Sequence, residues 1–222
     1  MFHNYFFLKR LAPELERELK GLALLECFSQ NKDELILGFG DPDRSFYIRA
    51  NLDPNVSLLS FPDEFARAGK NSVDLFSKLL DKKVTGVSVF AFERSFKIEL
   101  GADALIFKMH ARRANILHSR DNEIINLFRK NISQDFEIIP GELNQDINVS
   151  EPALAEHNYD PTSLIPALGK ETKVYLEKSG FYEKQDAEKW DLLKELLNQL
   201  DKNPIYLHET PAISLVDPST EQ

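Results

Sequence analysis

The N-terminal segment carries leucines at helical spacing. Leu8, Leu11, Leu15 and Leu19 recur every three or four positions, while glutamates and Lys20 occupy the other faces. Apolar residues at this spacing form one stripe along a helix, which can be buried while the remaining faces contact water. The pattern therefore predicts an amphipathic first helix, although Pro13 lies inside it.

Short apolar or alternating runs follow, at residues 22–29, 34–39 and 46–52. Turn-forming residues separate them, namely Asn31-Lys32-Asp33 and Gly40-Asp41-Pro42-Asp43. Because connections this short join neighbouring antiparallel strands, the series predicts an antiparallel meander.

A second helix is predicted after residues 60–64, whose Ser, Pro and acidic residues are typical of a helix start. Its buried stripe would consist of Phe65, Ala68, Val73, Phe76 and Leu80. Strand patterns then resume at residues 84–91, 96–100, 104–109 and 114–118. Sheet, helix and sheet in one block indicate an α+β or β-sandwich domain over residues 1–139.

Beyond residue 139 the pattern becomes helical. A polar, proline-marked joint over residues 140–162 precedes helical spacing at residues 163–167, 170–178 and 187–200. Leu168-Gly169 between the first two helices is typical of a helix-hairpin-helix, although any small helical bundle would show the same spacing. We therefore predict a helical module over residues 140–203. Two short strands, at 205–208 and 212–216, and a tail would occupy residues 204–222.

Charge is divided unevenly along the chain. The chain has 27 Lys and Arg residues and 36 Asp and Glu residues, which gives a net charge of −9. Residues 1–130 contain every arginine and have a net charge of +2, whereas residues 131–222 have a net charge of −11. Because a guanidinium can bond two phosphate oxygens at once, any contact with nucleic acid is expected on the N-terminal part.

Composition excludes several classes of protein. With 222 residues and 42% hydrophobic content, the chain can bury a core of one or two domains. Its single cysteine, Cys27, excludes an internal disulfide framework and a four-cysteine zinc site, and its apolar neighbours predict a core position. No apolar run approaches the roughly 20 residues of a membrane span, and no signal-peptide pattern is present. We expect a cytoplasmic protein without membrane contact.

Catalytic motifs are not recognisable in the sequence. It lacks the glycine-rich loops that bind phosphates or dinucleotides, the paired histidines of zinc proteases and the nucleophile elbow of hydrolases. The five histidines show no spacing typical of a metal site. We therefore expect no catalytic residue, no metal and no cofactor, in a protein that binds its partner rather than acting as an enzyme.

Two polar clusters interrupt the strand patterns. Glu93 and Arg94 lie in the otherwise apolar segment 92–96, where adjacent strand residues point to opposite faces. One of the two would therefore face the core or lie at a bend, and an internal ion pair is the alternative to a binding role.

The second cluster, residues 108–115, combines Lys108, His110, Arg112, Arg113 and Asn115. A solvated turn between strands would explain it. A phosphate-binding lip would also explain it, provided that Arg94 lies nearby.

Six segments resemble, in order, the N-terminal domain of the NFACT family, a ribosome-associated quality-control family that includes bacterial proteins first called fibronectin-binding protein A. These segments are residues 5–8, 28–37, 60–65, 92–96, 111–117 and 164–176. Glu93-Arg94 stands at the family's Asp-Arg strand motif, with Glu in place of Asp. Residues 111–117 resemble its Gly-Arg-His-Ser-Asn-Ile-Ile segment, with Arg113-Ala114 in place of His-Ser.

This resemblance implies a fold and a function. The fold would be α+β, with a β-sandwich-like N-terminal domain similar to that of formamidopyrimidine-DNA glycosylases, followed by a helix-hairpin-helix module. The function would be binding of tRNA on large ribosomal subunits that carry stalled peptidyl-tRNA. This binding would help to add an untemplated C-terminal tail to the nascent chain. Carried over by position, the resemblance points to Glu93, Arg94, Arg112 and Asn115, to which the second cluster adds Lys108 and Arg113 as expected nucleic-acid contacts.

A DNA glycosylase and a surface adhesin are the alternatives to an RNA-binding protein. A DNA glycosylase of the similar fold would need an N-terminal proline amine and an adjacent glutamate, but Phe2 and His3 stand there. Its zinc finger cannot be built from one cysteine, so this class is disfavoured. A surface adhesin that binds fibronectin is the remaining alternative, and the sequence shows no export signal for it.

Overall fold

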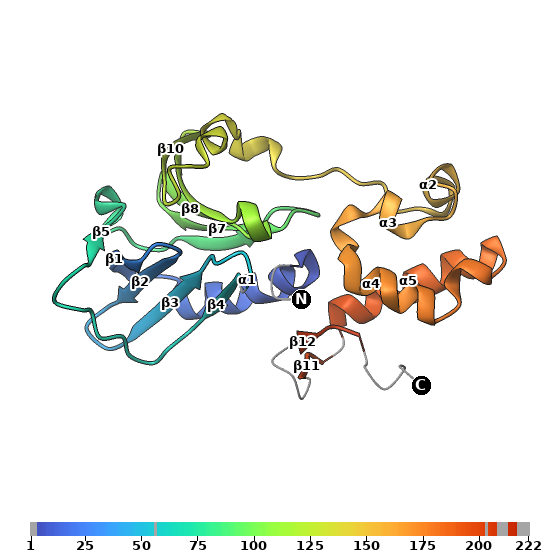
Figure 1. Ribbon diagram of the computed structural model, residues 1–222, viewed down its shortest axis with the longest axis horizontal. Helices are drawn as coiled ribbons and strands as arrows, with labels where there is room; N and C mark the ends of the chain where they lie inside the picture. Colours follow the sequence, from blue (N-terminus) through green and yellow to red (C-terminus); the bar gives the residue numbers. More distant parts are fainter. Residues whose placement is uncertain (1–3, 56, 203, 208–212, 217–222) are drawn as a thin grey trace.

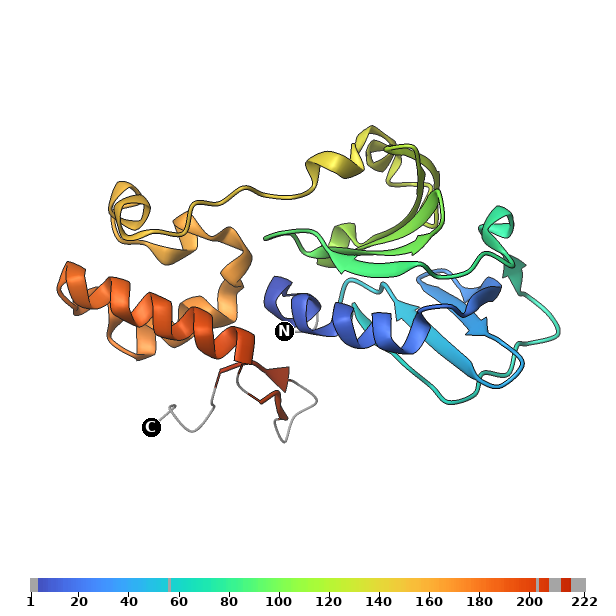
Figure 2. The same ribbon diagram turned by 180° about the vertical axis from the view of Figure 1, so that it is seen from behind.

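The computed structural model describes residues 4–55, 57–202, 204–207 and 213–216 of the chain. Two five-stranded antiparallel sheets form one end of the molecule, and a helical part forms the other (Figures 1 and 2). The chain is therefore α+β, with the sheets first and the helical part after them, as the sequence predicts.

The first sheet, sheet A, has the strand order β4-β3-β2-β1-β5, and all neighbouring strands are antiparallel. Strands β1, β2 and β3 are consecutive in both sequence and space, so the predicted meander is confirmed. The strands are β1 (Ala23–Asn31), β2 (Glu34–Gly40), β3 (Ser45–Asn51), β4 (Leu58–Ser60) and β5 (Val73–Asp74).

The second sheet, sheet B, is a five-stranded meander with the order β10-β9-β8-β7-β6. Its strands are β6 (Gly86–Val89), β7 (Ser95–Leu100), β8 (Asp103–Lys108), β9 (Asn115–Arg120) and β10 (Glu123–Leu127). The four predicted segments are confirmed, whereas β10 was not predicted. It pairs with β9 through a two-residue turn in which Asp121 and Asn122 have φ angles of 50° and 66°. Two positive φ angles are typical of a tight hairpin turn, and Asp and Asn tolerate them.

The two sheets enclose one main core. Along β7, Phe96, Ile98 and Leu100 face this core, as the two-residue period of a strand requires. The opposite face of sheet B is also covered, because Ile138 and Leu143 pack against it from the segment that follows the sheet. That segment contains the short 3-10 helices η3 (Ser133–Glu137) and η4 (Pro140–Glu142).

Helix α1 (Tyr5–Leu19) joins this core to the helical part. The Asn4 side chain accepts a hydrogen bond of 2.8 Å from the Phe6 N–H and so caps the helix. Tyr5 and Phe6 pack in the core of the helical part, whereas Leu8, Ala12, Leu15 and Leu19 pack in the main core. The predicted first helix is confirmed, and one helix serves two cores (Figure 2).

The helical part contains α2 (Glu151–Glu156), α3 (Pro161–Leu164), η5 (Pro166–Leu168), α4 (Gly169–Lys178), η6 (Phe181–Glu183) and α5 (Asp186–Lys202). A short helix, a turn ending at Gly169 with a φ of 76°, and a second helix follow one another as predicted. Helix α2 lies in the stretch predicted only as a joint. Strands β11 (Tyr206–Leu207) and β12 (Ile213–Ser214) pair as a hairpin. Residues 208 and 212 of the predicted strands lie outside the described residues, as do Phe2 and His3.

The helix predicted after residue 60 is absent, and this prediction was wrong. The segment instead runs in extended form to β5 and the 3-10 helix η1 (Ser77–Leu79), with positive φ angles at Asn71 and Phe76. It covers the outer face of sheet A, where the Arg67 guanidinium lies 4.5 Å from the centre of the buried Phe28 ring. Ala68 and Val73, assigned to the buried stripe, are exposed. The packing of this segment on Phe28, together with the low helix propensity of Gly69, outweighs the weak helical pattern.

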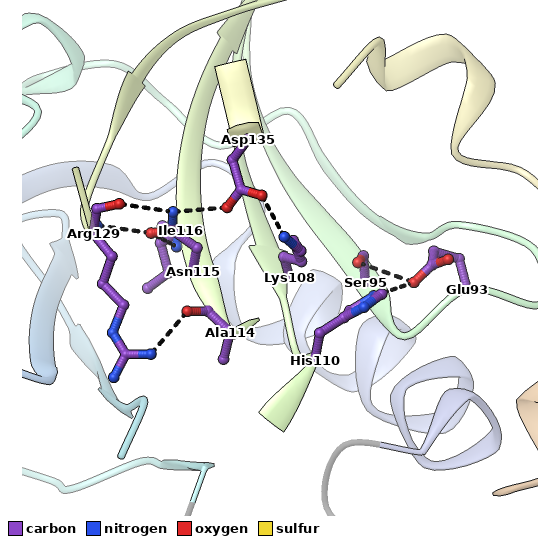
Figure 3. Close-up of polar contacts among 9 residues, drawn as sticks. All are labelled: Glu93, Ser95, Lys108, His110, Ala114, Asn115, Ile116, Arg129 and Asp135. Carbon is purple, nitrogen blue, oxygen red and sulfur yellow. Dashed lines mark hydrogen bonds and ion pairs between the residues drawn. The ribbon is translucent and has the colours of Figure 1, made fainter. Parts of the chain in front are cut away.

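Arg129 connects the two sheets, and Figure 3 shows its contacts with Ala114 and Asn115 on the side of sheet B. It follows β10 and is 9% exposed. Its guanidinium donates hydrogen bonds to the Ala114 carbonyl at 3.1 Å and to the Leu52 carbonyl at 2.7 Å, and it pairs with the Asp33 carboxylate. Ala114 precedes β9 of sheet B, whereas Asp33 and Leu52 belong to the turns of sheet A. One side chain therefore joins the strand ends of sheet A to the start of β9 in sheet B.

Replacement of this guanidinium is expected to destabilise the fold. Arg129→Met keeps the aliphatic stem but leaves two carbonyls and the Asp33 carboxylate without their donor, so the free energy of unfolding should fall by about 3 kcal/mol. Urea denaturation measures this change. Lys130→Met is the matched control: Lys130 is exposed and has no ion-pair partner among the described residues, so its replacement should change stability by less than about 0.5 kcal/mol. Equal effects of the two substitutions would contradict the role given to Arg129.

Candidate nucleic-acid interface

Two turns of sheet B lie side by side and bring the predicted clusters together. Ser95 of β7 pairs with Lys108 of β8, and beyond this pair the Met109 N–H donates to the Arg94 carbonyl at 2.8 Å. The next residues outward are Glu93 and His110, and their side chains are hydrogen-bonded (Figure 3). Glu93 therefore lies at a bend, one of the two positions that the sequence allowed.

Glu93 is held by three donors. Its carboxylate accepts hydrogen bonds from the Arg94 N–H at 2.7 Å, from the Ser95 hydroxyl at 3.5 Å and from His110. Burial alone would raise the pKa of Glu93, but the hydrogen bond and charge of His110 and the Arg94 N–H outweigh it and hold this pKa below its usual range. Glu93 thus orients the backbone of the turn, and the guanidinium of Arg94 remains exposed.

Both turns contain a residue in the left-handed region. Phe92 has a φ of 53° and Ala111 has a φ of 49°. For residues with a side chain this conformation costs on the order of 1–2 kcal/mol, and it persists where the surroundings impose it. Phe92 packs 5.2 Å from the Tyr5 ring and Ala111 begins the 3-10 helix η2 (Ala111–Arg113). The Phe92 turn is therefore held by its contact with α1, and the Ala111 turn by the 3-10 helix that begins there.

Lys108 and Asn115 are internal, and their assignment to the contact surface requires correction. Asn115 is fully buried: its amide NH2 donates to the Asp135 carboxylate at 2.8 Å and its amide oxygen accepts from the Arg129 N–H at 2.8 Å. The Lys108 side chain is 9% exposed and pairs with the same carboxylate (Figure 3). Asn115 is thus a positioning residue that links β9 to the Arg129 turn.

Arg112 and Arg113 are exposed on η2, and they border a basic groove. This groove has a volume of about 800 Å³ and is lined by Arg112, Arg113, Lys32 and Lys130 together with Arg129. The first four cations have no carboxylate partner among the described residues. Asp33, the acidic residue of this groove, is already paired with Arg129. The groove therefore carries an uncompensated positive charge.

Arg94 belongs to a different hollow, the junction cleft. This cleft of about 520 Å³ lies between the Phe92–Arg94 turn and the start of α4, where Lys170 also lines it. The predicted contact residues are thus divided: Arg94 faces the junction cleft, whereas Arg112 and Arg113 face the basic groove. Glu93 and His110 connect the two, because they border the junction cleft and also a side pocket that Arg113 lines.

Asp135 and Arg129 were missed by sequence reasoning. Asp135 lies in the polar segment 131–137 and is 1% exposed, yet nothing in its neighbours distinguishes it from the exposed Glu137. His110 was recognised only as part of a cluster.

Three further features of the described residues concern metal binding, membrane crossing and the single thiol. Among the described residues, no three of the His, Cys, Asp and Glu side chains are grouped as metal ligands would be. Within the same residues, none of the helices combines the length and apolar character needed to cross a bilayer. Cys27 is buried, and burial raises the pKa of its thiol well above the usual range.

The fold is similar to that of three solved bacterial structures. One is the N-terminal domain of the fibronectin-binding protein PavA from Streptococcus pneumoniae, with a TM-score of 0.61 and 18% identity over 98% of this chain and 91% of that one. Another is the fibrinogen-binding protein from Staphylococcus aureus, with a TM-score of 0.66 and 13% identity over 96% and 89% of the two chains.

The third is the N-terminal part of the fibronectin/fibrinogen-binding protein from Streptococcus suis, with a TM-score of 0.63 and 13% identity over 96% and 90% of the two chains. No protein-family model and no curated protein sequence matches the chain. The likeness establishes a shared fold over nearly the whole length, of the kind that the resemblance noted above implies.

The ionised state of Glu93 is expected to stabilise the fold. Its folded-state pKa is depressed, so this contribution is present above the pKa of the unfolded chain and is lost as the pH falls through the folded-state pKa. Glu93→Gln should lower the free energy of unfolding by about 1–2 kcal/mol at pH 7, and the difference from wild type should shrink below about pH 4.

Urea denaturation of both proteins across this pH range measures the difference. Glu99→Gln is the matched control, because the Glu99 carboxylate is 37% exposed and pairs with Lys97 on the surface. Its effect should stay within about 0.5 kcal/mol at each pH. If Glu93→Gln lowered the free energy of unfolding by the same amount at every pH, this result would contradict the ionised state assigned to the Glu93 carboxylate.

Proposed function

We propose that this chain is an RNA-binding module, related to the NFACT family, that contacts tRNA on the large ribosomal subunit. The observation that carries the proposal is the basic groove, where four cations on ordered turns have no carboxylate partner among the described residues. Phosphate contacts need such exposed donors held at fixed positions. The setting would be the cytoplasm, and the module would act by binding without a catalytic step of its own.

The charge distribution supports this proposal. The chain as a whole has a net charge of −9, so a nonspecific attraction to phosphate would be weak. The basic groove is a local exception, and Arg112 and Arg113 supply guanidinium groups that can bond two phosphate oxygens each. RNA binding would therefore be restricted to this face and to the adjoining junction cleft, where Arg94 and Lys170 lie.

Binding of an extracellular matrix protein is the second candidate function. The three similar structures carry the names of fibronectin- or fibrinogen-binding proteins, and these names favour it. The fold alone does not separate the two candidates, because one scaffold can present different surfaces. The basic groove favours RNA, since phosphate provides the dense negative charge that four unpaired cations match.

Removal of the two groove arginines tests the first candidate. Arg112→Gln/Arg113→Gln should weaken tRNA binding by about 100-fold or more, because each of the two lost charge-assisted contacts contributes about 1.5 kcal/mol or more. The slope of log affinity against log salt should also fall in magnitude by about 1.4–1.8, since each of the two phosphate contacts contributes about 0.7–0.9. Fluorescence anisotropy with labelled tRNA over a salt series measures both quantities.

The matched control is Lys173→Gln/Lys184→Gln, which makes the same charge change on exposed residues of the helical part. It should alter tRNA affinity by less than about threefold. The same variants are also titrated against immobilised fibronectin. Tight fibronectin binding by a wild-type chain that does not bind tRNA would replace the first candidate with the second.

A further inference from the structure

The side pocket combines an apolar floor with a polar rim. It has a volume of about 250 Å³ and lies on the outer face of sheet B, beside the Glu93–His110 pair. Ile106 and Leu117 of the sheet form its floor, and Ile138 and Leu143 of the covering segment line it as well. Both floor residues are fully buried, so the apolar surface that a ligand could reach is that of the half-buried Ile138 and Leu143.

The hydrogen-bonding capacity of the rim is mainly that of donors. Both oxygens of Asp135 are occupied, one by Lys108 and the other by Asn115. One oxygen of Glu93 already accepts from the Arg94 N–H, Ser95 and His110. The ammonium of Lys108 has three N–H donors, and Asp135 is its one acceptor among the described residues.

Arg113 adds further donors at the mouth of the pocket. Its guanidinium has no acceptor among the described residues, although it lines both this pocket and the basic groove. The charges of Lys108 and Asp135 balance, and Glu93 is already hydrogen-bonded to His110, which leaves Arg113 as the cation of the rim without an acceptor among the described residues. A buried ammonium with unused donors is costly unless an acceptor reaches it, so the pocket is suited to an acceptor-rich, anionic group.

We propose that the side pocket binds a small carboxylic acid with a compact apolar body. Its carboxylate would accept hydrogen bonds from Lys108 and Arg113, and its apolar body would lie against Ile138 and Leu143, the half-buried apolar side chains of the pocket. Two sources supply this chemistry, the C-terminal residue of a polypeptide and a free organic acid. The inference does not rest on RNA binding, because the floor and Lys108 lie away from the basic groove.

A nucleobase suits the pocket less well. Its ring N–H groups would need acceptors on the protein, whereas among the described lining side chains one oxygen of Glu93 and the amide oxygen of Gln134 are the carboxylate and amide acceptors not already engaged. An aromatic ring that could stack on a base is also missing from the described lining, apart from the imidazole of His110.

The experiment follows methyl signals of the full chain by NMR during titration. The probes are N-acetyl-L-leucine, which represents a polypeptide end, and 4-methylpentanoate, a free acid with the same apolar body. Both are compared with their uncharged amides, and uridine is a further probe. The expected result is a saturable shift of the Ile106, Leu117, Ile138 and Leu143 methyl signals with a Kd on the order of 1 mM, typical of ligands this small.

Each amide should bind about 10-fold more weakly than its acid, since it lacks the charge-assisted hydrogen bonds. Tighter binding of N-acetyl-L-leucine assigns the pocket to a polypeptide end, and tighter or equal binding of 4-methylpentanoate assigns it to a free acid.

Arg113→Gln should weaken acid binding about 10-fold, because one charged donor is lost. Arg112→Gln is the matched control: it changes the neighbouring arginine of the same turn, which lines the basic groove but not the side pocket, and it should leave acid binding unchanged. Both residues are exposed, so both variants should keep the wild-type methyl spectrum in the absence of probe.

Three results would overturn the proposal. The four methyl signals would remain unshifted by either acid, or the amides would bind as tightly as the acids, or uridine would shift these signals at lower concentration than either acid. Loss of tRNA binding in Arg112→Gln with acid binding intact would separate this pocket from the proposed RNA surface.

Discussion

The guanidinium of Arg129 is the interaction on which the arrangement of the two sheets depends. It bonds the Leu52 carbonyl and Asp33 on sheet A and the Ala114 carbonyl beside sheet B, while its own backbone N–H and carbonyl bond the Asn115 amide. From Asn115 the polar contacts continue through Asp135 to Lys108. A buried charge left unpaired is strongly destabilising, so this chain of contacts holds β8, β9 and the following turn in one geometry.

The same chain of contacts explains why neighbouring basic residues have different roles. Lys108 and Asn115 belong to strands whose side chains here face inward, whereas Arg112 and Arg113 lie on the short 3-10 turn between those strands and face water. The interior residues position the turn, and the turn presents the arginines. An RNA surface at this place would therefore derive its rigidity from buried polar groups and its affinity from exposed ones.

Sequence reasoning succeeded where a periodic pattern agreed with burial. The alternation of Phe96, Ile98 and Leu100 predicted β7, and the leucine stripe of residues 8–19 predicted α1. It failed at residues 65–76, where Phe65 packs on Phe28 and Phe76 packs in the main core, while Ala68 and Val73 between them are exposed. It also assigned Lys108 and Asn115 to the surface, because residue type alone does not show which side of a turn a side chain occupies. Partners such as Asp135, distant in sequence, decide that question.

Helix α1 contributes Tyr5 and Phe6 to one core and Leu8 to Leu19 to the other, and the Tyr5 ring contacts Phe92 at the tip of the β6–β7 turn. A rigid rod shared in this way couples the folding of the two cores, because neither can lose its packing without exposing part of α1. It also couples their positions. A partner that displaced α5 or η5 would move the start of α1, because α1 contacts both, and the Tyr5 ring would carry that movement to Phe92, the residue before Glu93. A movement of the helical part would then change the position of the turns at this end of sheet B.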